Sequence, residues 1–304
     1  MADLRVSLGA LTLRNPVLAA AGTFGYGAEF ARAVPLARLG GIITKTLTLA
    51  PRAGNPPPRL ADTPAGLLNS VGLANVGLET FLREKLPPLE SVDVPLIVSI
   101  LGETPEELQA LVQALDRAAR VDAIELNLSC PNQRGGRGLV AHDPEQTAAM
   151  VGAARAQTGK PLLAKLSPDV TDLTPIAQAA ERAGATAVVI ANTFPGMSID
   201  PATRRSRLGA ITGGLSGPAI RPLAVYRVWY TAPSLRVPVI GVGGVTSADD
   251  ALEFLIAGAA AVEVGTANFA DPRAPLRVAR GIERYLARHR LASVAELRGS
   301  LHTT

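Results

Sequence analysis

The sequence predicts an α/β protein whose main body is a (β/α)8 barrel preceded by an N-terminal β-hairpin. Short apolar runs alternate with segments of helical period along almost the whole chain, which is the pattern of a parallel sheet covered by helices. About eight such units fit into roughly 250 residues, the usual size of this barrel. The first strand-to-helix turn, 21–27, lacks the glycine spacing of a dinucleotide-binding turn. We therefore favour a closed barrel over an open, doubly wound sheet.

The strands of this barrel are short continuous apolar runs, as expected where both faces of a sheet are buried. They are predicted over 16–20, 41–44, 95–100, 123–128, 161–166, 187–191, 238–242 and 261–264. The hairpin is predicted over 5–13, where apolar and polar residues alternate around Gly9.

The clearest helix is predicted over 104–119, with Thr104 as its N-cap and Glu107 as the capping-box partner. Its buried face would carry Leu108, Leu111, Val112 and Leu115. Further helices are expected over 143–158, 173–183, 217–230, 247–257 and 272–288, the fourth of them capped by Ser247. The proline-rich segment 51–64 is expected to be a long loop after the second strand, and residues 1–304 a single domain.

Composition limits the class of protein. The single Cys excludes a disulfide within the chain, and it excludes an iron–sulfur cluster held by this chain alone, since such clusters take about four thiolates. No secretory signal is visible, and no stretch is apolar for long enough to span a membrane. We therefore expect a cytoplasmic protein that does not cross a membrane.

Charge and histidine content exclude several functions. The net charge is +4, but basic residues are scattered and aromatic residues make up only 4% of the chain, so no nucleic-acid partner is expected. His142, His289 and His302 have no metal-ligand spacing, and no metal site is expected. Ser, His and Asp are not grouped as a hydrolytic triad requires. The mild basicity suits a protein that binds anionic ligands.

Polar residues and glycines stand at the end of nearly every predicted strand. In a barrel the chemistry takes place at the C-terminal ends of the strands, so these residues are expected around one pocket. A lysine at a strand end is more often merely solvated, but a buried ammonium must be paired, and the coincidence along the chain favours a site. The residues concerned are Lys45, Thr46, Ser99, Asn127, Lys165, Asn192, Thr193, Gly243, Gly244, Gly265 and Thr266.

Two of these places predict a phosphate site. Gly243-Gly244 and Gly265-Thr266 follow the seventh and eighth strands, where glycine-containing loops free backbone N–H groups for a phosphate. An ordinary tight turn is the alternative for either pair alone. A lysine such as Lys165 or Lys45 would stabilise negative charge on a flavin ring, so FMN is a candidate cofactor.

The only cysteine, Cys130, lies just past a predicted strand, within Asn127-Leu128-Ser129-Cys130-Pro131-Asn132. Pro131 ends the strand pattern, and the glycine-rich segment 135–138 follows. A lone Cys is most often a small buried apolar residue. Two amides and a hydroxyl beside this thiol, on a loop, favour a site in which the thiol takes a proton from a ligand.

Together these motifs resemble the dihydroorotate dehydrogenase family, the FMN enzymes of pyrimidine synthesis. The resemblance runs from Asn15-Pro16 to Gly265-Thr266. Its most specific pieces are Asn69-Ser70-Val71-Gly72-Leu73, the segment around Cys130, and Asn192-Thr193.

The resemblance implies the role of each residue. Cys130 would be the general base that removes the C5 proton of dihydroorotate, while FMN accepts the hydride from C6. The substrate, dihydroorotate or orotate, would be bound by Lys45, Asn69, Ser70, Val71, Gly72, Leu73, Asn127, Asn192 and Thr193. FMN would be bound by Ala21, Lys45, Thr46, Ser99, Asn127, Lys165, Ala191, Gly217, Gly243, Gly244, Gly265 and Thr266. Ala21 and Ser99 stand where the family often has Ser and Asn.

The opening segment 22–27 is most like the class 1B catalytic subunit. That likeness implies a homodimer that assembles with an FAD and iron–sulfur subunit into a heterotetramer and passes electrons to NAD. A fumarate-reducing class 1A enzyme and a related FMN-dependent dihydropyrimidine oxidoreductase are the alternatives. A phosphate-binding aldolase or isomerase barrel without flavin, and a barrel that serves only in assembly, are more distant ones.

Overall fold

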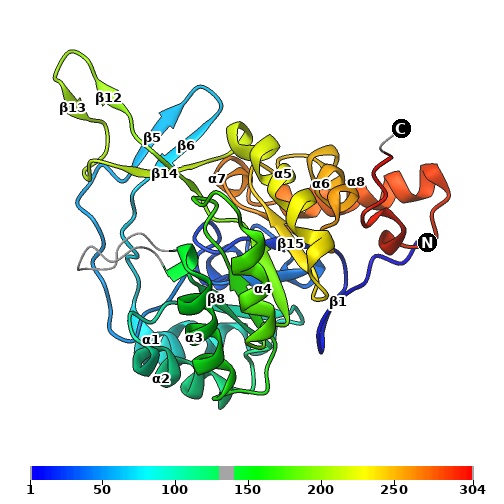
Figure 1. Cartoon of the computed structure of the whole chain (residues 1–304), viewed down its shortest axis with the longest axis horizontal. Helices are drawn as coiled ribbons and strands as arrows, with labels where there is room; N and C mark the ends of the chain where they lie inside the picture. Colours follow the sequence, from blue (N-terminus) through cyan, green and yellow to red (C-terminus); the bar gives the residue numbers. More distant parts are fainter. Residues whose placement is uncertain (1, 130–139, 303–304) are drawn as a thin grey trace.

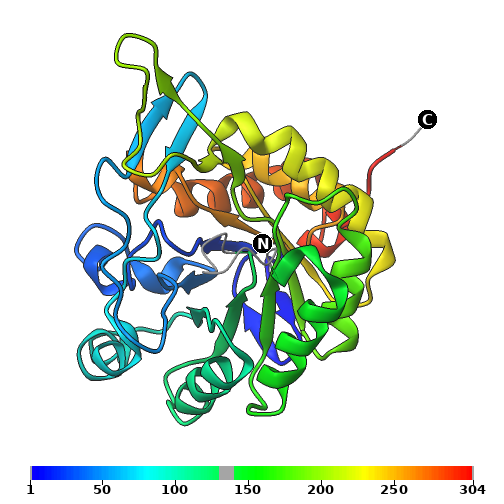
Figure 2. The same ribbon diagram turned by 60° about the vertical axis from the view of Figure 1, so that its left-hand side comes forward.

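Eight parallel strands close into a TIM barrel in the computed structural model, which describes residues 2–129 and 140–302 (Figures 1 and 2). Each strand pairs with the next one along the chain, and the last pairs with the first. The predicted barrel is therefore confirmed, with each predicted run containing one strand. The strands are β3 (Val17–Ala19), β4 (Gly41–Ile43), β7 (Leu96–Ile100), β8 (Ala123–Asn127), β9 (Leu162–Lys165), β10 (Ala187–Ile190), β15 (Val239–Val242) and β16 (Ala261–Val264).

Helices surround the barrel, and the six predicted ones are present. They are α2 (Pro105–Asp116), α3 (Pro144–Arg155), α4 (Thr174–Arg182), α5 (Arg221–Thr231), α6 (Ala248–Ala257) and α8 (Ala274–His289). A 3-10 turn, Pro218–Ile220, leads into α5. The short helices α1 (Gly77–Thr80), which continues as a π-helical turn over Phe81–Lys85, and α7 (Ala267–Ala270) were not expected from the sequence.

The predicted caps are present, with one correction. The Thr104 hydroxyl accepts a hydrogen bond from the Glu107 N–H, and the four predicted apolar residues of α2 are buried. The Glu107 carboxylate, however, accepts from the N–H of Glu103, not from that of Thr104. The full capping box is therefore wrong for α2, because the side chain reaches one residue further back. In α6, by contrast, Ser247 and Asp250 form the complete box.

A second, smaller sheet lies beyond the C-terminal ends of the barrel strands. Its order is β11 (Phe194–Gly196), β14 (Gly213–Ser216), β6 (Gly66–Asn69) and β5 (Leu60–Thr63). The end of segment 51–64 is thus a strand and not a loop, because Leu60–Thr63 pairs along the length of β6. A two-stranded hairpin, β12 (Ile199–Asp200) and β13 (Arg205–Ser206), projects from the same side (Figure 1).

The opposite end of the barrel carries the predicted N-terminal hairpin, β1 (Val6–Leu8) and β2 (Leu11–Leu13). Gly9 at its turn has φ +64° and lies against Thr186, just before β10. This left-handed backbone favours glycine. Leu8 and Leu13 are fully buried, so the hairpin covers the base of the barrel.

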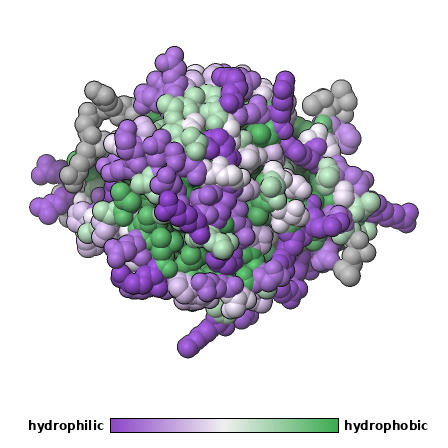
Figure 3. All heavy atoms as spheres, turned by 90° about the horizontal axis from the view of Figure 1, so that it is seen from below, coloured by the Kyte–Doolittle hydropathy of each residue, from purple (hydrophilic) through white to green (hydrophobic). Residues whose placement is uncertain are grey.

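One buried apolar cluster extends from Val6 to Leu297. On the face in Figure 3, apolar side chains appear in patches between hydrophilic ones. Among the described residues, no helix is both long and apolar enough to pass through a membrane.

Candidate active site

A cavity of about 500 Å³ opens between the C-terminal ends of the barrel strands and the smaller sheet, a volume typical of a small-molecule site. Residues expected from separate strands meet around it. Those that line it are Ala21, Lys45, Thr46, Asn69, Ser70, Val71, Gly72, Leu73, Asn127, Lys165, Ala191, Asn192, Thr193, Gly217, Gly243, Gly244, Gly265 and Thr266.

One residue expected at the site lies behind the wall of the cavity. Ser99 is fully buried and does not line the cavity. Its hydroxyl lies 2.9 Å from that of Thr46, so it supports a lining residue from behind. Cys130 lies outside the described residues. Its neighbour Ser129, at the end of the described segment, does line the cavity.

One end of the cavity is lined by two glycine-bearing turns, Gly243-Gly244 and Gly265-Thr266. Among the described residues, none accepts a hydrogen bond from the N–H of Gly243, Gly244, Gly265 or Thr266. The Thr266 hydroxyl donates to that of Ser216 at 2.8 Å. Free backbone donors at the C-terminal ends of β15 and β16 fit the phosphate of a nucleotide cofactor.

The neighbouring start of α6 is already satisfied from within the protein. The Asp250 carboxylate accepts hydrogen bonds from the N–H groups of Thr246 and Ser247 and forms an ion pair with Arg221 at the start of α5. The donors left for an anion are therefore those of the glycine turns, not those of the helix.

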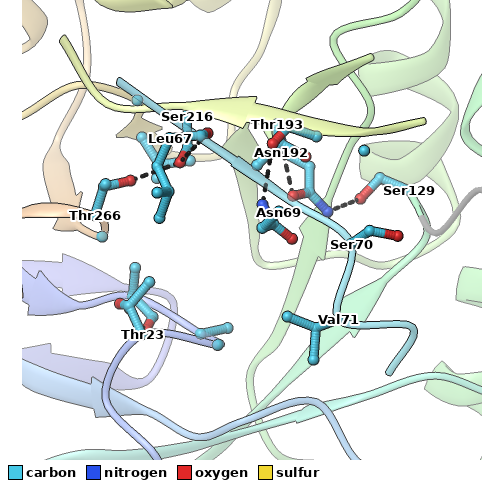
Figure 4. A pocket seen from close by; sticks show the side chains of 18 of the residues that line it. Thr23, Leu67, Asn69, Ser70, Val71, Ser129, Asn192, Thr193, Ser216 and Thr266 are labelled. Atoms are coloured by element: carbon cyan, nitrogen blue, oxygen red, sulfur yellow. Dashed lines mark hydrogen bonds between the residues drawn. The ribbon is translucent and has the colours of Figure 1, made fainter. Parts of the chain in front are cut away.

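The opposite wall is made of amides. Asn192 donates to the Ser129 hydroxyl (Figure 4). That hydroxyl in turn donates to Asn127 Oδ1 at 3.0 Å. Asn127 Nδ2 also donates to the Thr46 hydroxyl at 3.2 Å. Asn69 Nδ2 donates to the carbonyl of Gly214 and joins the smaller sheet to this wall. Such donors and acceptors suit a planar ring that carries amide groups.

Lys45 supplies a positive charge to the cavity. Burial lowers the pKa of its ammonium, and the nearby Arg59 lowers it further. No carboxylate in the described part of the chain lies within ion-pair distance of Lys45. An anionic ligand at this wall would relieve the unfavourable burial of that charge.

Lys165, on β9, lies on the floor of the cavity and is paired in a different way. Its Nζ is 2.7 Å from Glu263 Oε2 and 3.8 Å from Glu125 Oε2, and both carboxylates are fully buried. We call Glu125, Lys165 and Glu263 the buried charge cluster. The expectation that a buried ammonium must be paired is confirmed, but the two partners were not foreseen. An acidic residue within an otherwise uncharged strand singles out each of them in the sequence, but it does not show which side chain each one meets.

No group of three or more potential metal ligands occurs in the segments 2–129 and 140–302. The comparisons with known proteins agree with the chemistry of this cavity. Residues 3–286 match the family model described as dihydroorotate dehydrogenase. The chain belongs to the dihydroorotate dehydrogenase family. The resemblance inferred from the sequence is thereby confirmed, and with it membership in a family of oxidoreductases.

Relatives within the dihydroorotate dehydrogenase family cover the full chain. A protein of Geotalea daltonii named dihydroorotate dehydrogenase B (NAD(+)), catalytic subunit, is 52% identical over 98% of both chains. A protein of Trichlorobacter lovleyi with the same name is 50% identical over 98% of both chains. The crystal structure of the Eimeria tenella enzyme in complex with ferulenol has a TM-score of 0.79 at 26% identity, covering 99% of this chain and 89% of the other.

Proposed function

We propose that this chain oxidises dihydroorotate to orotate with FMN as its cofactor and Cys130 as general base. Family membership over residues 3–286 supports the reaction. The observation that carries the proposal is the convergence of residues from separate barrel strands around one cavity, with free N–H groups at one end and amides with a lysine at the other.

FMN would lie between these two ends. Its phosphate would be bound by the free N–H groups of Gly243, Gly244, Gly265 and Thr266, and its ring would lie above Lys165. When bound, FMN supplies a two-electron acceptor for the hydride of the substrate. Gly265 suits a close approach, because a Cβ built there would have no protein atom nearer than 3.7 Å and the space is left for a ligand.

The substrate would bind against the amide wall. Lys45 would pair with the carboxylate of orotate, and Asn69, Asn127, Asn192 and Thr193 would hydrogen-bond its ring and carboxylate. Ser70, Val71, Gly72 and Leu73 would close the site from the segment after β6. Gly72 and Leu73 both have positive φ, at 69° and 57°, so this segment turns sharply at the cavity.

Cys130 would remove the C5 proton. A free thiol has a pKa near ~8.5, so only a few per cent is ionised at neutral pH unless the site lowers it. Support comes from its neighbour Ser129, which two asparagines fix at the cavity wall.

We further propose the class B assembly. The supporting observation is the name of the relatives, dihydroorotate dehydrogenase B (NAD(+)), catalytic subunit. The chain would form a homodimer in the cytoplasm and join an FAD and iron–sulfur subunit in a heterotetramer. One Cys in the chain is too few for a cluster of its own.

The central test is anaerobic stopped-flow reduction of the flavin by dihydroorotate. The purified chain should be yellow and bind one FMN. Cys130→Ala should slow its reduction by roughly 10²–10⁴, the usual worth of a positioned base, while FMN and orotate still bind. Cys130→Ser should be intermediate at best. A Cys130→Ala variant with the parental rate and pH profile would show that the base lies elsewhere.

A second experiment tests the electron acceptor. The chain alone should reduce artificial dyes with dihydroorotate but not NAD, and NAD reduction should appear when the partner subunit is added. Efficient reduction of NAD by the single chain would contradict the assembly. Efficient reduction of fumarate would identify a class 1A enzyme, and turnover of uracil in preference to orotate would identify a dihydropyrimidine oxidoreductase.

A further inference from the structure

The barrel interior contains two buried carboxyl groups to which the proposed reaction assigns no role. The eight barrel strands carry only three ionisable side chains, Glu125 on β8, Lys165 on β9 and Glu263 on β16. All three meet as the buried charge cluster. Because β9 and β16 are separated by β10 and β15 in the barrel, the contact between Lys165 and Glu263 crosses the interior.

This cluster holds two carboxyl groups for one ammonium. Lys165 Nζ donates to Glu263 Oε2, whereas both oxygens of Glu125 and Oε1 of Glu263 have no hydrogen-bond partner among the described residues. With both carboxylates ionised, the cluster would place one net negative charge inside the barrel. An unpaired charge and unsatisfied oxygens in such a place are strongly unfavourable. One proton on either carboxyl group would remove the net charge and supply a donor.

The pKa shifts of Glu263 and Lys165 agree with one proton being held by the two carboxyl groups. Burial raises the pKa of Glu263, and Glu125 raises it further against the opposing effect of Lys165, to about 7. Burial lowers the pKa of Lys165, but the two carboxylates outweigh that effect and raise it above the ordinary value. The ammonium therefore stays charged at neutral pH while a carboxyl proton is exchangeable.

No other ionisable group in the described structure faces Glu263. The flanking strands β3 and β15 contribute none. The helices α6 and α8 pack against β16 from outside the barrel, on the side away from the cluster. Asn127, beside Lys165 in the β8–β9 pairing, carries an amide, which is not ionisable.

We propose that Glu125 and Glu263 hold one exchangeable proton between them, and that this proton links the charge of the cluster to the charge of a ligand above Lys165. Glu263 is then a positioning residue, since it acts through Lys165. Negative charge on the ligand favours the protonated cluster, so a proton is taken up from solvent. Two-electron reduction of bound FMN adds such charge. That last step rests on the proposed function, whereas the shared proton does not.

The first test needs no flavin. Carbon-13 NMR of the full chain, labelled at the glutamate side-chain carboxyl, is recorded from about pH 5 to pH 9. A buried carboxyl group should titrate near 7, as expected for Glu263. Glu263→Gln should abolish this titration, and Glu90→Gln, at an exposed site, should leave it unchanged. Glu125→Gln is the second variant if Glu263→Gln does not fold. Absence of any glutamate that titrates near neutral pH would overturn the shared proton.

The second test measures the midpoint potential of bound FMN against pH. Uptake of one proton by the cluster, added to one taken up by the flavin, should make the slope near neutral pH up to about twofold steeper than in Glu263→Gln. Equal slopes in the parent and Glu263→Gln would refute the coupling. A chain that binds no FMN at all would instead refute the proposed function and leave the NMR result standing.

Discussion

Asn192, just after β10, donates a hydrogen bond from its side-chain amide to the hydroxyl of Ser129, just after β8. The two residues are 63 positions apart in sequence, and Ser129 directly precedes Cys130. The Ser129 hydroxyl in turn donates a hydrogen bond to Asn127 Oδ1. Ser129 therefore connects the chain next to the proposed base with Asn127 and Asn192, both of which are proposed to bind the substrate.

We predict that Ser129→Ala slows flavin reduction by dihydroorotate while leaving the FMN content unchanged. Loss of a hydrogen bond is worth about 0.5–1.5 kcal/mol, so the rate should fall by up to about tenfold. Anaerobic stopped-flow absorbance measures it. Ser234→Ala, at an exposed position, is the matched control. If both variants reduce the flavin at the parental rate, the link through Ser129 has no part in positioning the base.

The barrel was predictable because its signals are local and repeat along the chain. Each strand from β3 to β16 is a short apolar run between turn residues or amphipathic segments, and α6 begins at a serine that caps it. The strand β5 was not predictable in the same way. Its sequence, Leu60-Ala-Asp-Thr63, is not apolar, and it exists because it pairs with β6, which also pairs with the distant β14.

The residues of the site were predictable where they stand at the C-terminal ends of strands, because these ends lie close together in a barrel. They were less predictable where the site depends on which side chains meet across the barrel interior. Lys165 could be placed at the cavity from its strand alone. Its partners Glu125 and Glu263 could not be matched to it, because register and stagger decide which inward-facing side chains meet. Ser99 shows the same limit. Its hydroxyl lies only 2.9 Å from that of Thr46, and the sequence does not indicate which of these two side chains lines the cavity and which lies behind it.

We predict that Gly265→Ala folds normally but binds FMN at least about tenfold more weakly. A Cβ there would have only ordinary contacts with Ala20 and Thr23, at 3.7 and 3.9 Å, so the fold should tolerate it. The added methyl would occupy the space of the phosphate and weaken a charge-assisted hydrogen bond worth about 1.5–3 kcal/mol.

Flavin fluorescence quenching measures that affinity, and the melting temperature reports on the fold. Gly152→Ala in α3 is the control, because no atom lies within 4 Å of its added Cβ. Gly244 is a less informative position. It has φ +73°, and a Cβ would lie 2.8 Å from that of Arg221, so strain alone would disturb the site. If Gly265→Ala binds flavin with the parental affinity, the phosphate does not bind at Gly265.

We predict that Lys45→Met weakens orotate binding by about tenfold or more, because it removes a charge-assisted hydrogen bond to the carboxylate. Orotate titration of the flavin absorbance measures it, with Lys85→Met as the control. Since burial and Arg59 lower the pKa of Lys45, orotate affinity in the parent should decline on alkaline titration before an ordinary lysine would lose its charge. Orotate affinity that is identical in Lys45→Met and the parent would exclude this lysine from the substrate site.

The last prediction concerns stability and the sign of its pH dependence. The pKa of Glu263 is about 7 in the folded protein against 4.5 for an ordinary Glu. Between these values the folded chain binds more protons than the unfolded chain, so its stability falls as pH rises. The stabilising contribution of the protonated carboxyl group is complete below about pH 4.5 and is lost as pH rises through about 7. Lys165 stays charged throughout, because its pKa is raised.

The parent should therefore lose about 3 kcal/mol of unfolding free energy across this window relative to Glu263→Gln, whose amide keeps the shape but does not titrate. Urea unfolding at several pH values measures the difference, and comparison with Glu263→Gln removes the contribution of the other titrating groups. Glu90→Gln should follow the parent, since its side chain is exposed. Parallel curves for the parent and Glu263→Gln would mean that Glu263 has the same ionisation in the folded and the unfolded chain, and that the barrel interior holds no additional proton.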